Sequence, residues 1–352
     1  MKNAAVFLSL LVLQSIACAI SAAGNQAAMN GEVLTFSEPT QLTFGEGHDE
    51  DPSLIFAQDG HYYMAWFSDR SGDGDIWMIE SRDGINWSQP WQITSGPDGD
   101  FYPALIQSQD GDFHLSWFRI DDEPPYISNI WYSSSPDAKN WSRPLQITDA
   151  PGVDWAPALV EDQNHKLWIY WASSRTGNKD IFAKFFDGAN WSAMIQITNH
   201  PDQDDYPTLV VSQDGSFNLV WNRYQGNELD GTGSHVQTLY ATSVDGQNWS
   251  EELVIYSPEK ENQVAMYPIL YQGSEDLQVA WTSNDNDPYG EIHTILLSDP
   301  ETEYQLTDTS SMPDYTPRFA PTDEKGTYLM VWIVDVNIEN RDVFSRFITF
   351  PW

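Results

Sequence analysis

The sequence is poor in cysteine and in basic residues. Its only cysteine, Cys18, lies in a leader-like segment, so removal of that segment leaves no thiol for a disulfide or a nucleophilic site. Lys and Arg number 16 against 52 Asp and Glu, which gives a formal net charge of −36. Such a field repels nucleic acid and anionic membranes but is compatible with cations and neutral glycans. The composition therefore argues against a nucleic-acid partner.

Long hydrophobic runs are also missing, apart from one near the N-terminus. Lys2, the mostly apolar run 4–17 and the small residues 21–23 have the pattern of an export signal over residues 1–23. This run is too short for a transmembrane segment, and no later run is long enough. The four residues 15–18 begin with Ser where a lipoprotein signal has a branched aliphatic residue. We therefore expect ordinary cleavage rather than a lipid anchor, and a periplasmic or secreted protein.

A repeat of about 50 residues organises the rest of the chain. Each unit holds four short β-like runs separated by turn signals, and it ends on a Gln-x-Thr tripeptide. The tripeptides begin at Gln41, Gln92, Gln146, Gln196 and Gln305, with a degenerate copy at Val254. A period of roughly 40–50 residues with four strands is typical of a β-propeller blade. We predict an all-β, six-bladed propeller of four-stranded blades, with a linker over 24–31 and a single domain over 32–352.

The last unit runs out of chain after its third strand. Residues 36–43 match residues 87–94 in type, and the latter form the end of the first unit. We therefore expect the N-terminal strand to complete the last blade and to close the ring, which removes exposed sheet edges.

A second motif recurs at the turn between the third and fourth strands. It reads Ser-x-Asp-Gly-x-Asn-Trp at 81–87 and 243–249, with variants at 135–141 and 185–191. Asp and Ser can bond the turn backbone, Gly supplies positive φ, and Trp packs back on the blade. The motif resembles the Asp-box of the sialidase-like propeller superfamily, where it stabilises a turn and carries no chemistry. The resemblance assigns this structural role to Ser81, Asp83, Trp87, Asp137, Trp141, Asp187, Trp191, Asp245 and Trp249.

The opposite face holds the loops that lead into each first strand and the longer, variable loops between the second and third strands. Five of the six leading loops contain Asp-x-x-Pro, and four of the variable loops begin near an arginine. The residues are Asp49, Asp100, Asp154, Asp204 and Asp314 with Arg70, Arg119, Arg175 and Arg223. Because variable loops on a rigid scaffold carry function, we expect these residues to ring the central channel as a ligand-binding face.

The same residues have a purely structural interpretation. The run 68–77 also resembles periplasmic Tol-type propellers, in which Asp and Arg recur blade after blade as architecture. Regular recurrence favours a network of caps and salt bridges between blades, since catalysis needs unlike residues in unlike blades.

One carboxylate breaks the repeat. Asp51 is the only acidic residue at its position, where the other blades carry Tyr102, Ala156, Tyr206, Tyr267 and Thr316. Residues 51–54 followed by 60–64 are similar to the first blade of furanosidase-type glycoside hydrolases, in which the Asp before Pro is the general base. The resemblance makes Asp51 the candidate catalytic residue. An inverting pair would need a second carboxyl roughly 6.5–9.5 Å away, for which Glu50 and Asp154 are candidates.

Other chemistries find less support. The Arg-Ile-Pro motif typical of sialidases is absent, and the seven His show no zinc spacing. Clustered carboxylates could bind Ca²⁺, although no linear calcium loop is present. These carboxylates are Asp98, Asp100, Asp202, Asp204 and Asp205. We expect no required cofactor.

Three functions remain open for what we expect to be a monomer. The first is recognition of a glycan on the Asp/Arg face, the second is glycoside hydrolysis with Asp51, and the third is a periplasmic scaffold for a protein partner. A deep, aromatic-lined pocket with two carboxyls would favour the enzyme. A channel plugged by Arg–Asp pairs would favour the scaffold.

Overall fold

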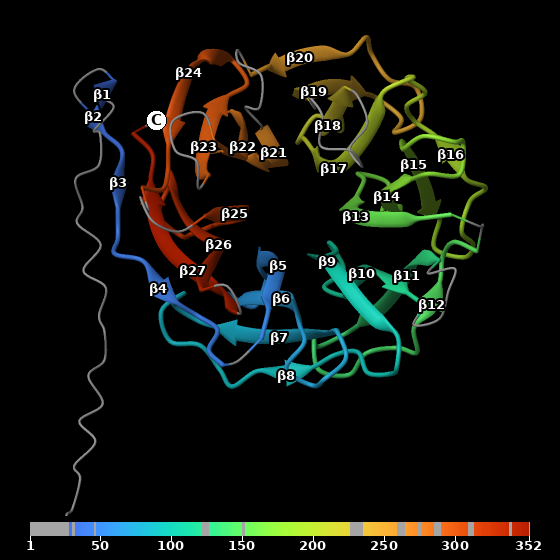
Figure 1. Ribbon diagram of the computed structural model, residues 1–352, viewed down its shortest axis with the longest axis horizontal. Helices are drawn as coiled ribbons and strands as arrows, with labels where there is room; N and C mark the ends of the chain where they lie inside the picture. The colour runs from blue at the N-terminus through green and yellow to red at the C-terminus, as the bar shows by residue number, and fades with distance from the viewer. Residues whose placement is uncertain are drawn as a thin grey trace, which may run out of the picture.

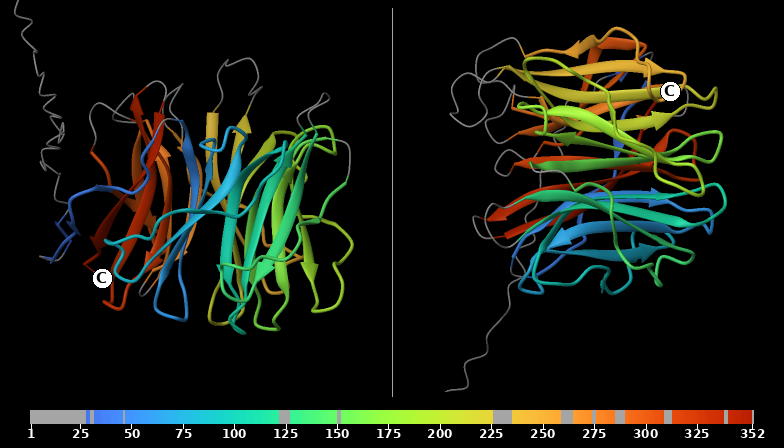
Figure 2. Two further views of the ribbon diagram at one scale, coloured as in Figure 1. Left: turned by 90° about the horizontal axis from the view of Figure 1, so that it is seen from below. Right: turned by 90° about the vertical axis from the view of Figure 1, so that its right-hand side faces the viewer.

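The computed structural model describes residues 28–29, 32–45, 47–121, 127–149, 152–225, 235–258, 265–273, 276–284, 290–308, 313–337 and 340–351. The expected export signal, residues 1–23, lies outside these residues. Figure 1 shows six sheets arranged around a central axis, and Figure 2 shows that their strands run between two faces of the ring. The predicted all-β, six-bladed propeller is thereby confirmed. No helix in the described part of the chain is long and apolar enough to cross a membrane.

Each blade is an antiparallel sheet whose strands follow chain order from the axis outward. Blade one contains β5 (Asp49–Phe56), β6 (Tyr62–Ser68), β7 (Asp75–Ser81) and β8 (Trp91–Gln92). Blade two contains β9 (Gly99–Gln107), β10 (Phe113–Ile120), β11 (Ser128–Ser135) and β12 (Leu145–Gln146). Blade three contains β13 (Asp154–Glu161), β14 (Leu167–Ser173), β15 (Asp180–Phe186) and β16 (Ile195–Gln196).

The second half of the ring repeats this order. Blade four contains β17 (Gln203–Val211), β18 (Phe217–Gln225), β19 (His235–Ser243) and β20 (Leu253–Tyr256). Blade five contains β21 (Ala265–Gln272), β22 (Leu277–Ser283), β23 (Glu291–Leu296) and β24 (Asp299–Gln305). Blade six contains β25 (Asp314–Pro321), β26 (Thr327–Asn337) and β27 (Asn340–Thr349). A separate pair, β1 (Ala28–Met29) and β2 (Glu32–Val33), precedes the ring.

The outer edge of blade six is covered by the N-terminal segment. Two short strands, β3 (Thr35–Phe36) and β4 (Thr40–Gln41), pair antiparallel with β27. Just beyond β4, the Thr43 hydroxyl accepts the Val343 N–H at 2.9 Å. The same bond recurs at the equivalent place in blade one, where Thr94 accepts the Ile76 N–H at 2.9 Å. In the five blades that carry Gln-x-Thr, its Thr therefore ties the outer strand to the third strand.

A buried tryptophan on each second strand fills the wall between blades. These residues are Trp66, Trp117, Trp171, Trp221, Trp281 and Trp332, and all are at most 1% exposed. In five blades the indole N–H donates to the Asp of Asp-x-x-Pro, at 2.7 Å for Trp117 and Asp100. Blade five has Ala265 in place of that Asp, and the Trp281 indole nitrogen has no hydrogen-bond partner in the described structure.

Candidate functional site

A bulge interrupts the innermost strand of every blade. The register shifts at the residue before the repeated proline, and that residue has a left-handed backbone with φ between 46° and 56°. These six residues are Asp51, Tyr102, Ala156, Tyr206, Tyr267 and Thr316. A bulge re-aims a side chain, and proline suits it because the missing N–H leaves no ladder bond unmade. In each blade, the residue before the repeated proline therefore points in a direction that the regular alternation of the strand would not give it.

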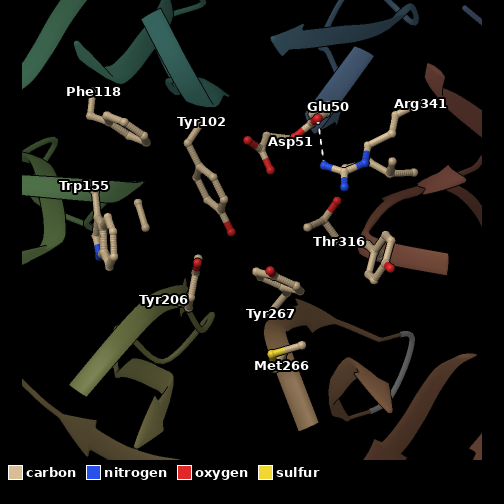
Figure 3. Close-up of a pocket in the computed structure, with 13 residues that line it drawn as sticks. Glu50, Asp51, Tyr102, Phe118, Trp155, Tyr206, Met266, Tyr267, Thr316 and Arg341 are labelled. Atoms are coloured by element: carbon tan, nitrogen blue, oxygen red, sulfur yellow. Dashed lines mark hydrogen bonds and ion pairs between the residues drawn. The ribbon is translucent and has the colours of Figure 1, made fainter. Parts of the chain in front are cut away.

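All six bulge residues line one central cavity of about 500 Å³. The other lining residues are Glu50, Phe118, Trp155, Met266, Tyr315, Ile333 and Arg341. Figure 3 shows two unlike halves, with Phe118 and Trp155 at one end and Glu50, Asp51, Thr316 and Arg341 at the other. Non-glycine residues with positive φ cluster at functional sites, where the surrounding structure holds the strain. Six of them around one cavity make it the candidate site.

The polar half holds two adjacent carboxylates in unlike environments. Burial raises the pKa of Asp51 to about 7, the Glu50 charge adds to the rise, and Arg318 and Arg341 oppose it. Glu50 accepts a 2.9 Å bond from Arg341, which also donates to Asp335 at 2.7 Å. A carboxyl with a pKa near 7 exchanges its proton readily at neutral pH, as a general acid or base must.

Thr316 adds an unused hydroxyl to this half. The residue is 3% exposed, it lines the cavity, and its Oγ1 has no hydrogen-bond partner in the described structure. A buried polar atom without a partner costs free energy, and here that cost falls on a residue of the bulge ring.

Aromatic rings form the remaining wall. The Tyr206 ring lies 5.9 Å from Tyr102, 4.9 Å from Tyr267 and 6.3 Å from Trp155, between ring centroids. Burial raises the pKa of Tyr102 and Tyr206 well above the usual value and that of Tyr267 to about 12. The three hydroxyls therefore stay protonated at neutral pH and can donate as well as accept.

The five aspartates expected to ring the channel lie elsewhere. None of Asp49, Asp100, Asp154, Asp204 and Asp314 is among the residues that line the cavity, and all are at most 5% exposed. Four of them bind the arginine of their own blade at 2.6–2.7 Å, and these pairs are Arg70–Asp49, Arg119–Asp100, Arg175–Asp154 and Arg223–Asp204. In a regular strand residues i and i+2 share a face, and the bulge breaks that alternation. The bulge therefore lets one strand place Asp49 between the blades and Asp51 in the cavity.

The four box turns also lie away from the cavity. Asp83 accepts the N–H groups of Ile85 and Asn86 at 2.9 and 2.7 Å, and Trp87 donates to the Gly84 carbonyl at 3.2 Å. Matching bonds to turn backbone occur at Asp137, Asp187, Asp245 and Trp141. These bonds lower the pKa of Asp137 and Asp245 to about 2, and those from Asn140 and Asn248 have the largest effect.

Two box tryptophans pack against aromatic neighbours instead. Trp191 contacts Phe186, and Trp249 meets Tyr170 edge to face at 6.1 Å. No Ser, Asp or Trp of the four boxes is among the cavity-lining residues.

The acidic cluster considered for Ca²⁺ is largely tied up by other partners. Asp100 and Asp204 hold arginines, while Asp205 accepts from Trp155 and Lys179 at 2.6 and 2.9 Å. Across the described ranges no three His, Cys, Asp or Glu side chains lie together as a metal site would require.

Several lining residues were not assigned a role from the sequence. Tyr102, Tyr206 and Tyr267 stood out only by contrast with Asp51, although the x-Pro repeat marks their shared position. Trp155 immediately precedes a bulge residue, which is a weaker signal. Arg341 reaches the cavity from β27, and nothing in its local sequence marks it.

No known family profile and no curated protein sequence matches the chain. Solved structures do match its fold. A protein of unknown function from Dyadobacter fermentans is 15% identical with a TM-score of 0.73, covering 90% of this chain and 99% of that one. An α-L-arabinanase from Penicillium chrysogenum, solved with arabinobiose, is 15% identical with a TM-score of 0.64, covering 89% and 98%. An intramolecular trans-sialidase from Ruminococcus gnavus is 12% identical with a TM-score of 0.60, covering 85% and 94%. At such identities the matches show the fold alone, that of a β-propeller.

Proposed function

We propose that the protein binds a saccharide in the central cavity. The observation that carries this proposal is the convergence of all six bulge residues on one cavity, with aromatic walls and few polar groups. Ligand sites are concave and mostly apolar, with a small number of placed polar groups, and about 300–1,000 Å³ is their usual size. Two of the similar propellers described above are glycan enzymes by name. With the export signal expected at residues 1–23, the glycan would be met in the periplasm or outside the cell.

The placement of the arginines favours this proposal over a plugged scaffold. The four Asp–Arg pairs lie in the blade walls, and Arg341 is the only arginine among the described residues that line the cavity. Arg341 already binds Glu50 and Asp335, while Arg318 lies over the Tyr102 ring at 5.8 Å and is not among the lining residues. The lining that the structure describes therefore offers a carboxylated ligand no cation without a carboxylate partner. A neutral sugar suits this charge balance best.

Binding can be tested on a glycan array and by calorimetry with the variant Tyr206→Ala. Alanine tolerates this backbone, because Ala156 has φ 47° against 52° for Tyr206. We expect at least a tenfold loss of affinity, about 1.4 kcal/mol, with the melting temperature little changed. Asp83→Ala, on the opposite face, is the matched control and should bind as the parent does. A parent protein that retains no saccharide on the array would rule the proposal out.

The second candidate function is glycoside hydrolysis, favoured by the pKa of about 7 at Asp51. Ionised Asp51 would accept the proton of a water molecule that attacks the anomeric carbon. The bond from that carbon to the aryl oxygen breaks, and the phenolate leaves and takes a proton from solvent. Asp51→Asn should keep saccharide binding but lower turnover of aryl glycosides by about 10²–10⁴-fold, as loss of a general base does. Turnover that survives this substitution would exclude Asp51 as the base.

A further inference from the structure

The ring of bulge residues has one gap. Five blades place a side chain with a polar end at this position, whereas blade three has Ala156. Its neighbour in the chain, Trp155, also lines the cavity, and Figure 3 shows Trp155 and Phe118 together at one end. The gap thus opens the cavity toward an aromatic surface, at the end away from Asp51 and Arg341.

Groups outside the cavity hold the Trp155 ring in place. Its indole N–H donates to Asp205 at 2.6 Å, and the Lys179 ammonium lies 2.9 Å from the other Asp205 oxygen. That ammonium is also 3.7 Å from the centre of the Trp155 ring, a cation–π contact. Asp205 is fully buried, and neither Asp205 nor Lys179 lines the cavity. The ring is therefore oriented before any ligand arrives, which lowers the entropy cost of binding.

We propose that Trp155 and the gap at Ala156 form a second sugar subsite, so that the cavity takes a saccharide of at least two units. The inference rests on the saccharide-binding function proposed above and adds the length of the ligand. One ring packs its C–H face against Trp155 and Phe118, while the next unit and the linkage between them lie toward Asp51 and Thr316.

The chemistry of the two ends supports this division. A sugar ring has an apolar face of C–H groups, which suits a flat aromatic surface, and a rim of hydroxyls, which needs hydrogen-bonding partners. Trp155 and Phe118 form the aromatic surface at one end, and the polar side chains of Asp51, Thr316 and Arg341 lie at the other end. Two linked units can use both environments at once, each with the groups that suit it. The ligand that uses both is an oligosaccharide.

The test closes the gap by substitution. Ala156→Tyr introduces the residue that three other blades carry at this position with φ of 52–56°, close to the 47° of Ala156, so the backbone accepts it. Affinities are measured by calorimetry for L-arabinose, arabinobiose and arabinotriose, with galactose and lactose as a second ladder. In the parent, the disaccharide should bind at least tenfold more tightly than the monosaccharide. Ala156→Tyr should abolish this gain and leave monosaccharide affinity within about twofold of the parent, which is under ~0.5 kcal/mol.

Trp155→Ala and Trp155→Phe give an independent reading of the subsite. The alanine variant should also abolish the disaccharide gain, and the phenylalanine variant should keep part of it. Equal binding of mono- and disaccharide by the parent, or an unchanged ratio in Ala156→Tyr and Trp155→Ala, would overturn the second subsite while saccharide binding itself stands. Absence of binding for both ladders and on the glycan array would overturn the saccharide function, and this inference with it.

Discussion

Two aspartates on β5, two residues apart, have opposite surroundings. Asp49 is buried in the blade wall, where Trp66 donates to it at 2.9 Å and Arg70 at 2.7 Å. Asp51 is the bulge residue and lines the cavity, where burial raises its pKa to about 7. The first belongs to a set repeated around the ring, and the second has no acidic counterpart in any other blade. A residue that recurs in most blades thus belongs to the packing between blades. A residue that breaks the repeat at the bulge position belongs to the candidate site.

The largest effect is expected where the wall itself is opened. Deleting residues 32–43 removes β3 and β4 and exposes the edge of β27, together with the bonds that Thr43 and Gln41 make to blade six. We expect aggregation, measured by light scattering, or loss of cooperative unfolding, measured by thermal melts. A chain shortened only by residues 1–31 is the control. A melting temperature within about 2 °C of that control, which is about 1 kcal/mol for a chain of this size, would contradict the closure of the ring by this segment.

A smaller effect separates wall from cavity directly. Asp100→Ala leaves the Arg119 guanidinium, 16% exposed, and the Trp117 indole without their shared acceptor. Breaking a buried pair in this way costs about 3–5 kcal/mol. Asp51→Ala should not destabilise the protein, because the residue holds no partner between the blades and alanine accepts its backbone. At neutral pH the variant should be more stable than the parent, since the raised pKa of Asp51 makes its ionised form costly in the folded state. Chemical denaturation of both variants gives the comparison. Equal destabilisation would contradict the division into wall and cavity residues.

Much of this contrast can be predicted from the sequence. The 50-residue repeat, the Gln-x-Thr ends and the match of 36–43 to 87–94 are enough to predict six blades and their closure. The orientation of Asp49 and its equivalents cannot be read in the same way, because a period of two places Asp49 and Asp51 on one face and only the bulge separates them. Arg341 and Trp155 join the cavity through the closure of the ring, which brings together blades that are far apart in sequence.

A modest effect of pH is expected at the seam. Burial raises the pKa of Asp342 to about 6, although Thr43 and Gln41 donate to its carboxylate at 3.1 and 2.8 Å. The folded state then binds this proton more tightly than the unfolded state does. The contribution of Asp342 therefore makes stability fall as pH rises from about 4 to 6. Asp342→Asn should lose that slope in denaturation curves measured across the interval, and curves that stay parallel to those of the parent would contradict the raised pKa.

The measurement that tests the central claim most directly is a titration of the Asp51 carboxyl in the folded protein. Carbon-13 NMR of the aspartate carboxyls, with Asp51→Asn to assign the signal, needs no knowledge of the ligand. Because the bulge turns Asp51 into a cavity beside Glu50, we predict a midpoint near pH 7. A midpoint near the ordinary aspartate value of about 4 would show that Asp51 is solvated like a surface carboxylate, and would contradict its role as the acid–base group of the site.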